Sequence, residues 1–247
     1  MDVDQGTAEE WKAVIRGLRT LLQGGQDLGL DPPQASPQSV AYLEARPSRG
    51  MPSREGEPLG GSLEELREVI GDCRRCPLHK GRTHLVFGEG NPRAELVFVG
   101  EGPGREEDRI GRPFVGEAGH LLTRIIQAMG LGREDVYICN VVKCRPPRNR
   151  DPQTDEIRAC KPFLYRQLEL IGPKVICTLG RIAGRELLGT GFSMTRDRGK
   201  WTEYQGIPVM PTFHPAYLLR NVSAKRPVWE DVQEIMKVLG LEGAQRD

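Results

Sequence analysis

The chain has 247 residues, with 34 acidic against 35 basic side chains and a formal net charge of +1. This balance excludes binding through an overall positive charge, so any anionic partner must be held by local basic groups. No apolar run approaches the length of a membrane span, and the first residues lack the basic start and apolar core of a signal peptide, so we expect a cytosolic protein without membrane contact. In that compartment, six cysteines favour metal or redox chemistry over structural disulfides.

The N-terminal part differs in composition from the rest of the chain. Residues 7–23 carry apolar side chains at helical spacing behind a capping-box pattern, which predicts an amphipathic helix. That helix either docks back on the domain or binds a partner protein. Residues 24–61 are rich in Pro, Gly, Ser and Gln and predict a disordered linker. We therefore divide the chain into an N-terminal helix and linker, 1–61, and one folded domain, 62–247.

The folded domain alternates predicted helices and strands. A capping box at Ser62 begins the first helix. Apolar runs predict four buried strands, at 95–99, 136–142, 175–179 and 209–213. Apolar stripes at helical spacing predict further helices at 117–129, 154–170, 181–188 and 228–239. This alternation implies an α/β fold, a parallel sheet with helices on both faces.

The first predicted strand ends in a glycine-rich turn around Glu101, and a run of carboxylates follows. Ligands of open α/β sheets bind beyond the carboxyl ends of strands, and glycine lets the backbone approach a ligand closely. Alone, the pattern is more typical of a tight turn beside a solvated acidic patch. Its meaning depends on the other segments.

Four cysteines could converge on one metal site: Cys73, Cys76, Cys144 and Cys160. The first two form a C-x2-C pair, and three of the four adjoin proline or basic residues in predicted loops. Four thiolates suit a cubane iron–sulfur cluster or a structural zinc ion, and the spacing does not separate the two. Cys139 and Cys177 lie in apolar strand sequence, which predicts buried, inert thiols.

Five features follow one another along the chain: the cysteine pair, Gly-Glu-Gly-Pro-Gly at 100–104, Gly-Arg-Pro-Phe-Val-Gly at 111–116, Asn-Val-Val-Lys-Cys-Arg-Pro-Pro at 140–147 and His-Pro-Ala-Tyr-Leu-Leu-Arg at 214–220. Together they closely resemble the family 4 uracil-DNA glycosylases, the iron–sulfur members of that superfamily, over about residues 63–240. The resemblance implies a three-layer α/β/α sandwich around a four-stranded, mainly parallel sheet. It implies a [4Fe–4S] cluster on the four cysteines and removal of uracil from DNA, which begins base excision repair. The enzyme would act as a monomer on uracil-containing DNA at the nucleoid.

Three details of the motifs refine the resemblance. The family usually has Ala where this chain has Gly102, a small change that preserves the turn. Relatives that attach covalently to their product carry a basic, His-containing insertion, whereas the loop at 145–152 has no His, so we expect no covalent product complex. A related family of broader substrate range lacks the carboxylate found here at Glu101, which favours the uracil-specific branch.

The resemblance also implies catalytic roles for two residues. Breaking the C–N bond requires positive charge to be stabilised on the sugar and negative charge on the departing uracil. Glu101 would hold the attacking water and stabilise the sugar cation, and His214 would donate a hydrogen bond to the uracil. Each has a plainer alternative, a turn carboxylate and a structurally bonded histidine.

Recognition of the base falls to the motifs around Phe114 and Asn140. Phe114 would stack on the flipped base, unless it plugs the core from its loop. The Asn140 amide would accept from N3–H and donate to O4 of uracil, unless it caps a loop. Gly102, in the turn that carries Glu101, is a further substrate-binding candidate. Glu107 either lines the pocket or orders its loop.

The residues after His214 are candidates for DNA contact. Leu218 or Leu219 would fill the gap left by the flipped nucleotide, with Arg220 on a phosphate, unless the leucines belong to a short helix and pack inward. Other loop cations are candidate phosphate contacts, and we expect about half of them to be merely solvated. They are Arg145, Arg148, Arg150, Arg196, Arg198 and Lys200.

A second class of function is open to this sequence. It is a non-catalytic iron–sulfur protein that binds nucleic acid and assists replication or repair, attached through residues 7–23. Such a binder would not need Glu101, Asn140 and His214 together, so these three residues favour the enzyme. A zinc-stabilised domain would differ only at the metal, and would be colourless where a cluster is brown.

Overall fold

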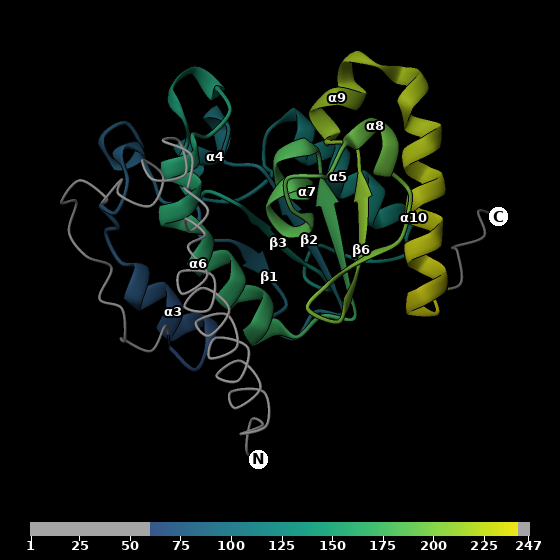
Figure 1. Ribbon diagram of the computed structural model, residues 1–247, viewed down its shortest axis with the longest axis horizontal. Coiled ribbons are helices and arrows are strands. Elements are labelled where there is room, and N and C mark those ends of the chain that lie inside the picture. The colour runs from purple at the N-terminus through teal and green to yellow at the C-terminus, as the bar shows by residue number, and fades with distance from the viewer. Residues whose placement is uncertain (1–59, 242–247) are drawn as a thin grey trace, which may run out of the picture. The chain divides into compact units, whose positions relative to one another are not determined.

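The computed structural model describes residues 60–241 of the chain (Figure 1). The helix predicted at 7–23 and all but the last two residues of the predicted linker, 24–61, lie outside the described residues. A six-stranded sheet in the order β1-β3-β2-β4-β6-β5 forms the centre of the domain. Helices cover both faces of this sheet, so the predicted three-layer α/β/α sandwich is confirmed. Within residues 60–241, none of the helices has the length and apolar character that crossing a membrane requires.

Four parallel strands form the middle of the sheet, as predicted. In spatial order they are β3 (Tyr137–Asn140), β2 (Leu96–Gly100), β4 (Val175–Leu179) and β6 (Ile207–Thr212). Two antiparallel strands, β1 (Glu89–Gly90) and β5 (Thr202–Tyr204), extend the edges. The expectation of a four-stranded sheet is therefore corrected to six, because strands this short show no apolar alternation.

The longer helices agree with the predicted ones to within about one turn. They are α3 (Leu63–Ile70), α5 (Glu117–Ala128), α6 (Thr154–Ile171), α7 (Arg181–Leu188) and α10 (Lys225–Leu239). The predicted cap of α3 is present, since the Ser62 hydroxyl accepts a hydrogen bond from the Glu65 amide at 3.1 Å. The described residues also include three short helices, α4 (Arg105–Ile110), α8 (Met194–Asp197) and α9 (Pro215–Arg220). Single 3-10 turns occur at Pro77–Lys80, Pro147–Asn149 and Val222–Ala224.

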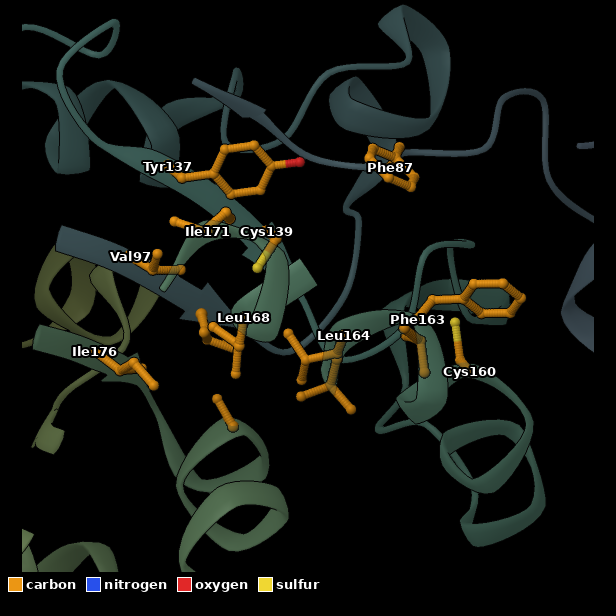
Figure 2. Close-up of a cluster of buried hydrophobic side chains, with 14 of the residues drawn as sticks. Phe87, Val97, Tyr137, Cys139, Cys160, Phe163, Leu164, Leu168, Ile171 and Ile176 are labelled. Atoms are coloured by element: carbon orange, nitrogen blue, oxygen red, sulfur yellow. The ribbon is translucent and has the colours of Figure 1, made fainter. Parts of the chain in front are cut away.

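Alternate side chains of each strand feed two separate cores. Val97 and Cys139 pack with α3, α6 and α7 in the core of Figure 2. Phe98 and Cys177 point to the other face and pack with α5, α9 and α10. This is the two-residue period of a strand buried on both faces. Both cysteines are fully buried, as predicted from their apolar surroundings.

A buried polar network crosses the core of Figure 2. Lys143 has no exposed surface, and its Nζ donates to the backbone oxygen of Asn140 at 2.7 Å and to Oε1 of Gln167 at 2.5 Å. Gln167 Nε2 in turn donates to the backbone oxygen of Phe87 at 2.9 Å and to the hydroxyl of Tyr137 at 3.2 Å. Burial lowers the pKa of Lys143. These hydrogen bonds fix the chain directly after β3, where the candidate site lies.

Candidate active site

A pocket of about 670 Å³ lies at the carboxyl ends of three parallel strands. Glu101 follows β2, Asn140 ends β3 and His214 comes just after β6. This is the edge of a parallel sheet where ligands bind in α/β proteins. The predicted site residues that line the pocket are Glu101, Gly102, Glu107, Phe114, Asn140, Arg150, His214 and Arg220. Arg105 and Asn149 also line it, although no motif or spacing in the sequence pointed to them.

The Glu101 carboxylate is partly buried in this pocket. Burial raises the pKa of Glu101 to about 7, the nearby negative charge of Asp151 adds to the rise, and the Arg181 guanidinium opposes it. Arg181 and Asp151 form an ion pair with each other. At neutral pH, Glu101 is therefore close to its midpoint, where a carboxyl group both binds and releases protons.

Asn140 presents an unpartnered amide oxygen. Its Oδ1 is buried and has no hydrogen-bond partner within residues 60–241. Gly100 lies beside Asn140 in the sheet, and a Cβ at Gly100 would come 2.4 Å from Oδ1 and 2.6 Å from the Phe114 ring. Asn140 and Phe114 therefore meet over a glycine that leaves no room for a side chain. A buried acceptor without a donor costs about 1–3 kcal/mol, which a ligand's N–H group would recover.

Phe114 stands in a turn that Arg133 holds. Its backbone has a φ of 51°, a left-handed conformation that is rare for an aromatic residue. Arg133 donates from Nη1 to the carbonyl of Phe114 at 2.9 Å and from Nη2 to the carbonyl of Pro113 at 2.7 Å. Nη2 of Arg133 also bonds Oε1 of Glu89 at 2.6 Å. Arg133 thus stabilises the strained turn, a role that sequence reasoning missed because it follows no motif.

Glu107 holds the same loop from the other side. Its Oε1 accepts hydrogen bonds from the amides of Val115 and Gly116, each at 2.9 Å. Glu107 lies in α4 and also lines the pocket. Both alternatives considered for this residue, lining the pocket and ordering its loop, therefore describe its geometry.

The turn after Glu101 has little spare room. A Cβ at Gly102 would lie 2.7 Å from Cγ2 of Val142, so an alanine here would require Val142 to move. The backbone oxygen of Glu101 accepts from the Val142 amide at 3.1 Å, which ties this turn to the segment after β3. Glycine at position 102 therefore matches the close approach of these two segments.

The ring of His214 is held by the helix that follows it. Its Nδ1 accepts a hydrogen bond from the Ala216 amide at 3.1 Å and so caps α9. In a neutral imidazole, an accepting Nδ1 leaves the proton on Nε2. Burial lowers the pKa of His214 to about 4, against a smaller opposite effect of Glu107. At neutral pH His214 is thus an uncharged donor, and its ring lies 5.5 Å from that of Phe114.

Helix α9 places its two leucines in different surroundings. Leu218 is 1% exposed and packs in the core, whereas Leu219 is 41% exposed. Tyr217 is exposed to the same extent and contacts Phe213, with ring centroids 4.9 Å apart. Of the two leucines predicted to fill the gap in the DNA, only Leu219 reaches the surface.

Several loop cations predicted to contact phosphate have partners inside the protein. Arg198 Nη1 bonds both carboxylate oxygens of Asp231 at 2.7 Å and the carbonyl of Pro227 at 3.0 Å. Two others are also paired with carboxylates, Arg150 with Glu156 and Arg196 with Asp197. Within residues 60–241, Arg145, Arg148 and Lys200 form no ion pair. The three paired arginines therefore hold the protein's own segments together, whereas the charges of Arg145, Arg148 and Lys200 are not neutralised by a carboxylate of the described residues.

The four cysteines of the predicted metal site influence one another electrostatically. Burial raises the pKa of Cys76 to about 11 and that of Cys160 to about 12, and the negative charge of Cys144 adds to both. Cys73 likewise raises the pKa of Cys144, although burial is again the larger cause. All four are free thiols. Arg82 Nη1 bonds both the Cys73 carbonyl at 2.7 Å and Cys144 Sγ at 3.1 Å, and the amide of Lys143, next to Cys144, bonds Cys160 Sγ, so Cys144 and Cys160 lie near the C-x2-C segment.

Hydrogen-bond donors reach the sulfurs of three of these cysteines. They are the Arg75 guanidinium to Cys73 at 3.3 Å, the Arg82 guanidinium to Cys144 at 3.1 Å and the Lys143 amide to Cys160 at 3.3 Å. Within residues 60–241, no three His, Cys, Asp or Glu side chains are arranged to hold a metal ion. N–H donors at the sulfurs stabilise thiolates, which suits a four-cysteine cluster or a four-cysteine zinc site alike.

Comparison with known proteins gives a consistent family. A family model described as the Uracil DNA glycosylase superfamily matches residues 87–233. The chain is 50% identical over 188 residues to a type-4 uracil-DNA glycosylase of Thermotoga maritima, covering 73% of this chain and 98% of that protein. It is 48% identical over 186 residues to the type-4 uracil-DNA glycosylase of Sulfurisphaera tokodaii, covering 72% of this chain and 84% of that protein.

Type-5 relatives are more distant. A type-5 uracil-DNA glycosylase of Pyrobaculum aerophilum is 30% identical over 210 residues, covering 72% of this chain and 92% of that protein. The type-4 protein of the same organism is 42% identical over 180 residues, covering 69% of this chain and 91% of that protein. The chain therefore belongs to the uracil DNA glycosylase superfamily, and within it to the type-4 uracil-DNA glycosylases that its motifs resemble.

Proposed function

We propose that this protein is a monofunctional uracil-DNA glycosylase that begins base excision repair. It hydrolyses the bond between C1′ of deoxyuridine and N1 of the base, releases free uracil and leaves an abasic site. The names of its type-4 relatives support this activity. The observation that carries the proposal is one pocket combining the Glu101 carboxylate, the unpartnered Asn140 oxygen and the neutral His214 ring. The activity belongs to the domain 62–247, which acts as a monomer.

The flipped uracil stacks on Phe114 and is recognised by Asn140. The Oδ1 of Asn140 accepts from N3–H of uracil, and its Nδ2 donates to O4. Cytosine has no N3–H and carries an amino group at position 4, so it leaves both amide groups unpaired at a cost of about 1–3 kcal/mol each. The unpartnered, buried Oδ1 supports this role because it lacks a donor that uracil supplies.

Glu101 and His214 stabilise the two charges that develop as the bond breaks. The electron pair of the C1′–N1 bond leaves with uracil, and the sugar becomes cationic. Ionised Glu101 stabilises this cation and orients a water, whose oxygen adds to C1′ while the carboxylate takes up its proton. The Nε2–H group of His214 donates to O2 of the departing uracil. Because His214 is neutral at physiological pH, it stabilises the anion as a hydrogen-bond donor.

The four cysteines Cys73, Cys76, Cys144 and Cys160 would hold a [4Fe–4S] cluster. Their thiols, with N–H donors to three of the sulfurs, support this assignment. When bound, such a cluster supplies a cross-link between the segment after α3, the loop after β3 and helix α6. The glycosylase chemistry described above uses only the side chains of the pocket.

DNA contact at the pocket falls to α9. Leu219 fills the gap left by the flipped nucleotide, and Arg220 binds a phosphate. The exposure of Leu219 and the position of Arg220 at the pocket support these roles. We assign Leu218 to the core and Arg198 to its pair with Asp231 instead.

The test is uracil release from a single-uracil oligonucleotide by anaerobically purified protein without added cofactor. We expect alkali-sensitive cleavage at the uracil, reduced at least about a hundredfold in Glu101→Gln, because the water and the sugar cation lose their carboxylate. The matched control is Glu169→Gln, which removes an exposed carboxylate from α6. Binding of the oligonucleotide without cleavage by the cluster-loaded wild type would refute the enzyme and favour the accessory protein.

A further inference from the structure

A second hollow adjoins the active-site pocket and has no part in the chemistry above. It measures about 400 Å³ and lies between the turn at Pro77–Lys80 and the loop at Pro147–Asn149. Pro146 lines both hollows, so they share a wall. A strand whose uridine enters the pocket can therefore continue directly into this neighbouring hollow.

The second hollow is lined by three cations and no carboxylate. They are Lys80, Arg145 and Arg148. Within residues 60–241, Lys80 and Arg148 form no ion pair, and Arg145 bonds only from its Nε to Oδ1 of Asn149 at 2.7 Å. Nearby arginines are neutralised instead, Arg82 by Asp72 and Arg150 by Glu156. On a chain of net charge +1, three uncompensated cations in one concave surface indicate a polyanionic ligand.

The loop that carries Arg148 is held in one conformation. Pro146 and Pro147 fix their own φ angles, and the Asn149 amide donates to the Pro146 carbonyl at 3.0 Å. Arg148 and Asn149 both have a φ of 56°, a left-handed conformation that costs free energy in residues other than glycine. A loop that is ordered before binding loses little entropy when a ligand arrives, so its cations contribute more to affinity.

We propose that this hollow binds the phosphodiester backbone of the uracil-bearing strand on one side of the flipped nucleotide. The inference rests on the proposed function and names a further part of its substrate site. The lining favours backbone over bases, because it supplies cations and prolines but no aromatic ring on which a base could stack. The contact is independent of sequence, weakened by salt and confined to one flank.

The test compares Lys80→Ser/Arg148→Ser with Arg93→Ser/Arg158→Ser, which removes two exposed cations that line neither hollow. We expect KM for a single-stranded uracil oligonucleotide to rise about tenfold in the first variant, since two exposed charge–phosphate contacts are lost. The slope of log(kcat/KM) against log salt should become shallower by about 1.4, or about 0.7 for each contact. Arg148→Ser alone should give about half of each change on the logarithmic scale.

Trimming the substrate locates the contact. Oligonucleotides cut back to the uridine on the 5′ or on the 3′ side should differ: removing one flank raises KM of the wild type but not of the double variant, and removing the other affects both equally. The proposal is wrong if the double variant keeps the KM and salt slope of the control variant. It is also wrong if trimming the 5′ flank and trimming the 3′ flank raise the KM of the wild type, relative to the double variant, by the same factor. Absence of uracil release by the wild type would instead refute the proposed function.

Discussion

The pKa of Glu101 sets the pH dependence of uracil release. Burial raises this pKa to about 7, and the proposed role requires the ionised form. The ionised fraction is then about 0.1 at about pH 6 and about 0.9 at about pH 8, so the rate should rise about tenfold between these values. The pKa of His214 is lowered to about 4, so this ring stays neutral and adds no second step in that range.

The assay is single-turnover uracil release at constant ionic strength between about pH 5 and about pH 9. Asp151→Asn removes a negative charge that raises the Glu101 pKa, so its acid limb should shift to lower pH. Glu234→Gln, on the exposed face of α10, is the matched control and should leave the limb in place. A midpoint near the ordinary carboxyl value of about 4.5, or a profile unaffected by Asp151→Asn, would refute the reasoning.

The same shift has a consequence for stability. Because the pKa of Glu101 is higher in the folded than in the unfolded protein, the folded state binds more protons between the two values. The free energy of unfolding therefore falls as pH rises from about 4.5 to about 7. Glu101→Gln should be more stable than the wild type above that range, by about 1–2 kcal/mol after allowing for the solvated part of the side chain, and equally stable below it. Chemical denaturation of both proteins at each end of this pH range measures the difference. A Glu101→Gln protein that is less stable than the wild type at the upper end would refute the prediction.

Three further changes test other parts of the site. Asn140→Ala should lower kcat/KM for uracil-containing DNA about a hundredfold without lowering the melting temperature, because it removes an unpartnered buried acceptor; a loss of stability would contradict this. Arg133→Met should release the turn of Phe114 and lower kcat/KM about tenfold. Arg133→Lys should recover only part of this activity, since lysine cannot bond the carbonyls of Pro113 and Phe114 in a fork. Full recovery by lysine would contradict the role given to the Arg133 guanidinium. Cys160→Ser should remove the brown absorption expected of the proposed cluster and lower the melting temperature, whereas Cys177→Ser, fully buried in β4, should keep the colour.

The central sheet and the pocket could be predicted because their signals are local. Apolar runs marked the four parallel strands, and the motif residues stood at or beyond their carboxyl ends. Parallel strands meet at one edge, so residues as distant as Glu101 and His214 had to converge. Helix α4 was missed because its acidic sequence has no apolar stripe, and Glu107 is used there to bond the neighbouring loop.

Other features depend on contacts that no local pattern reveals. A lysine is expected on the surface, yet Lys143 is buried because Gln167 and the Asn140 carbonyl accept hydrogen bonds from its Nζ. Arg133 bonds the carbonyls of Pro113 and Phe114 and the carboxylate of Glu89, and no sequence motif links these residues. Leu218 and Leu219 are identical in sequence terms, and only the orientation of α9 separates the buried one from the exposed one.

The glycine beneath the pocket limits how this enzyme can diversify. Every substitution of Gly100 adds at least a Cβ, which would collide with both the amide oxygen of Asn140 and the ring of Phe114. Any amino-acid substitution there should therefore displace Asn140 or Phe114 from the positions proposed for base recognition and lower activity. Variants selected for other damaged bases should instead accumulate their changes in the pocket walls, around Glu107 and Tyr217, and leave the floor untouched.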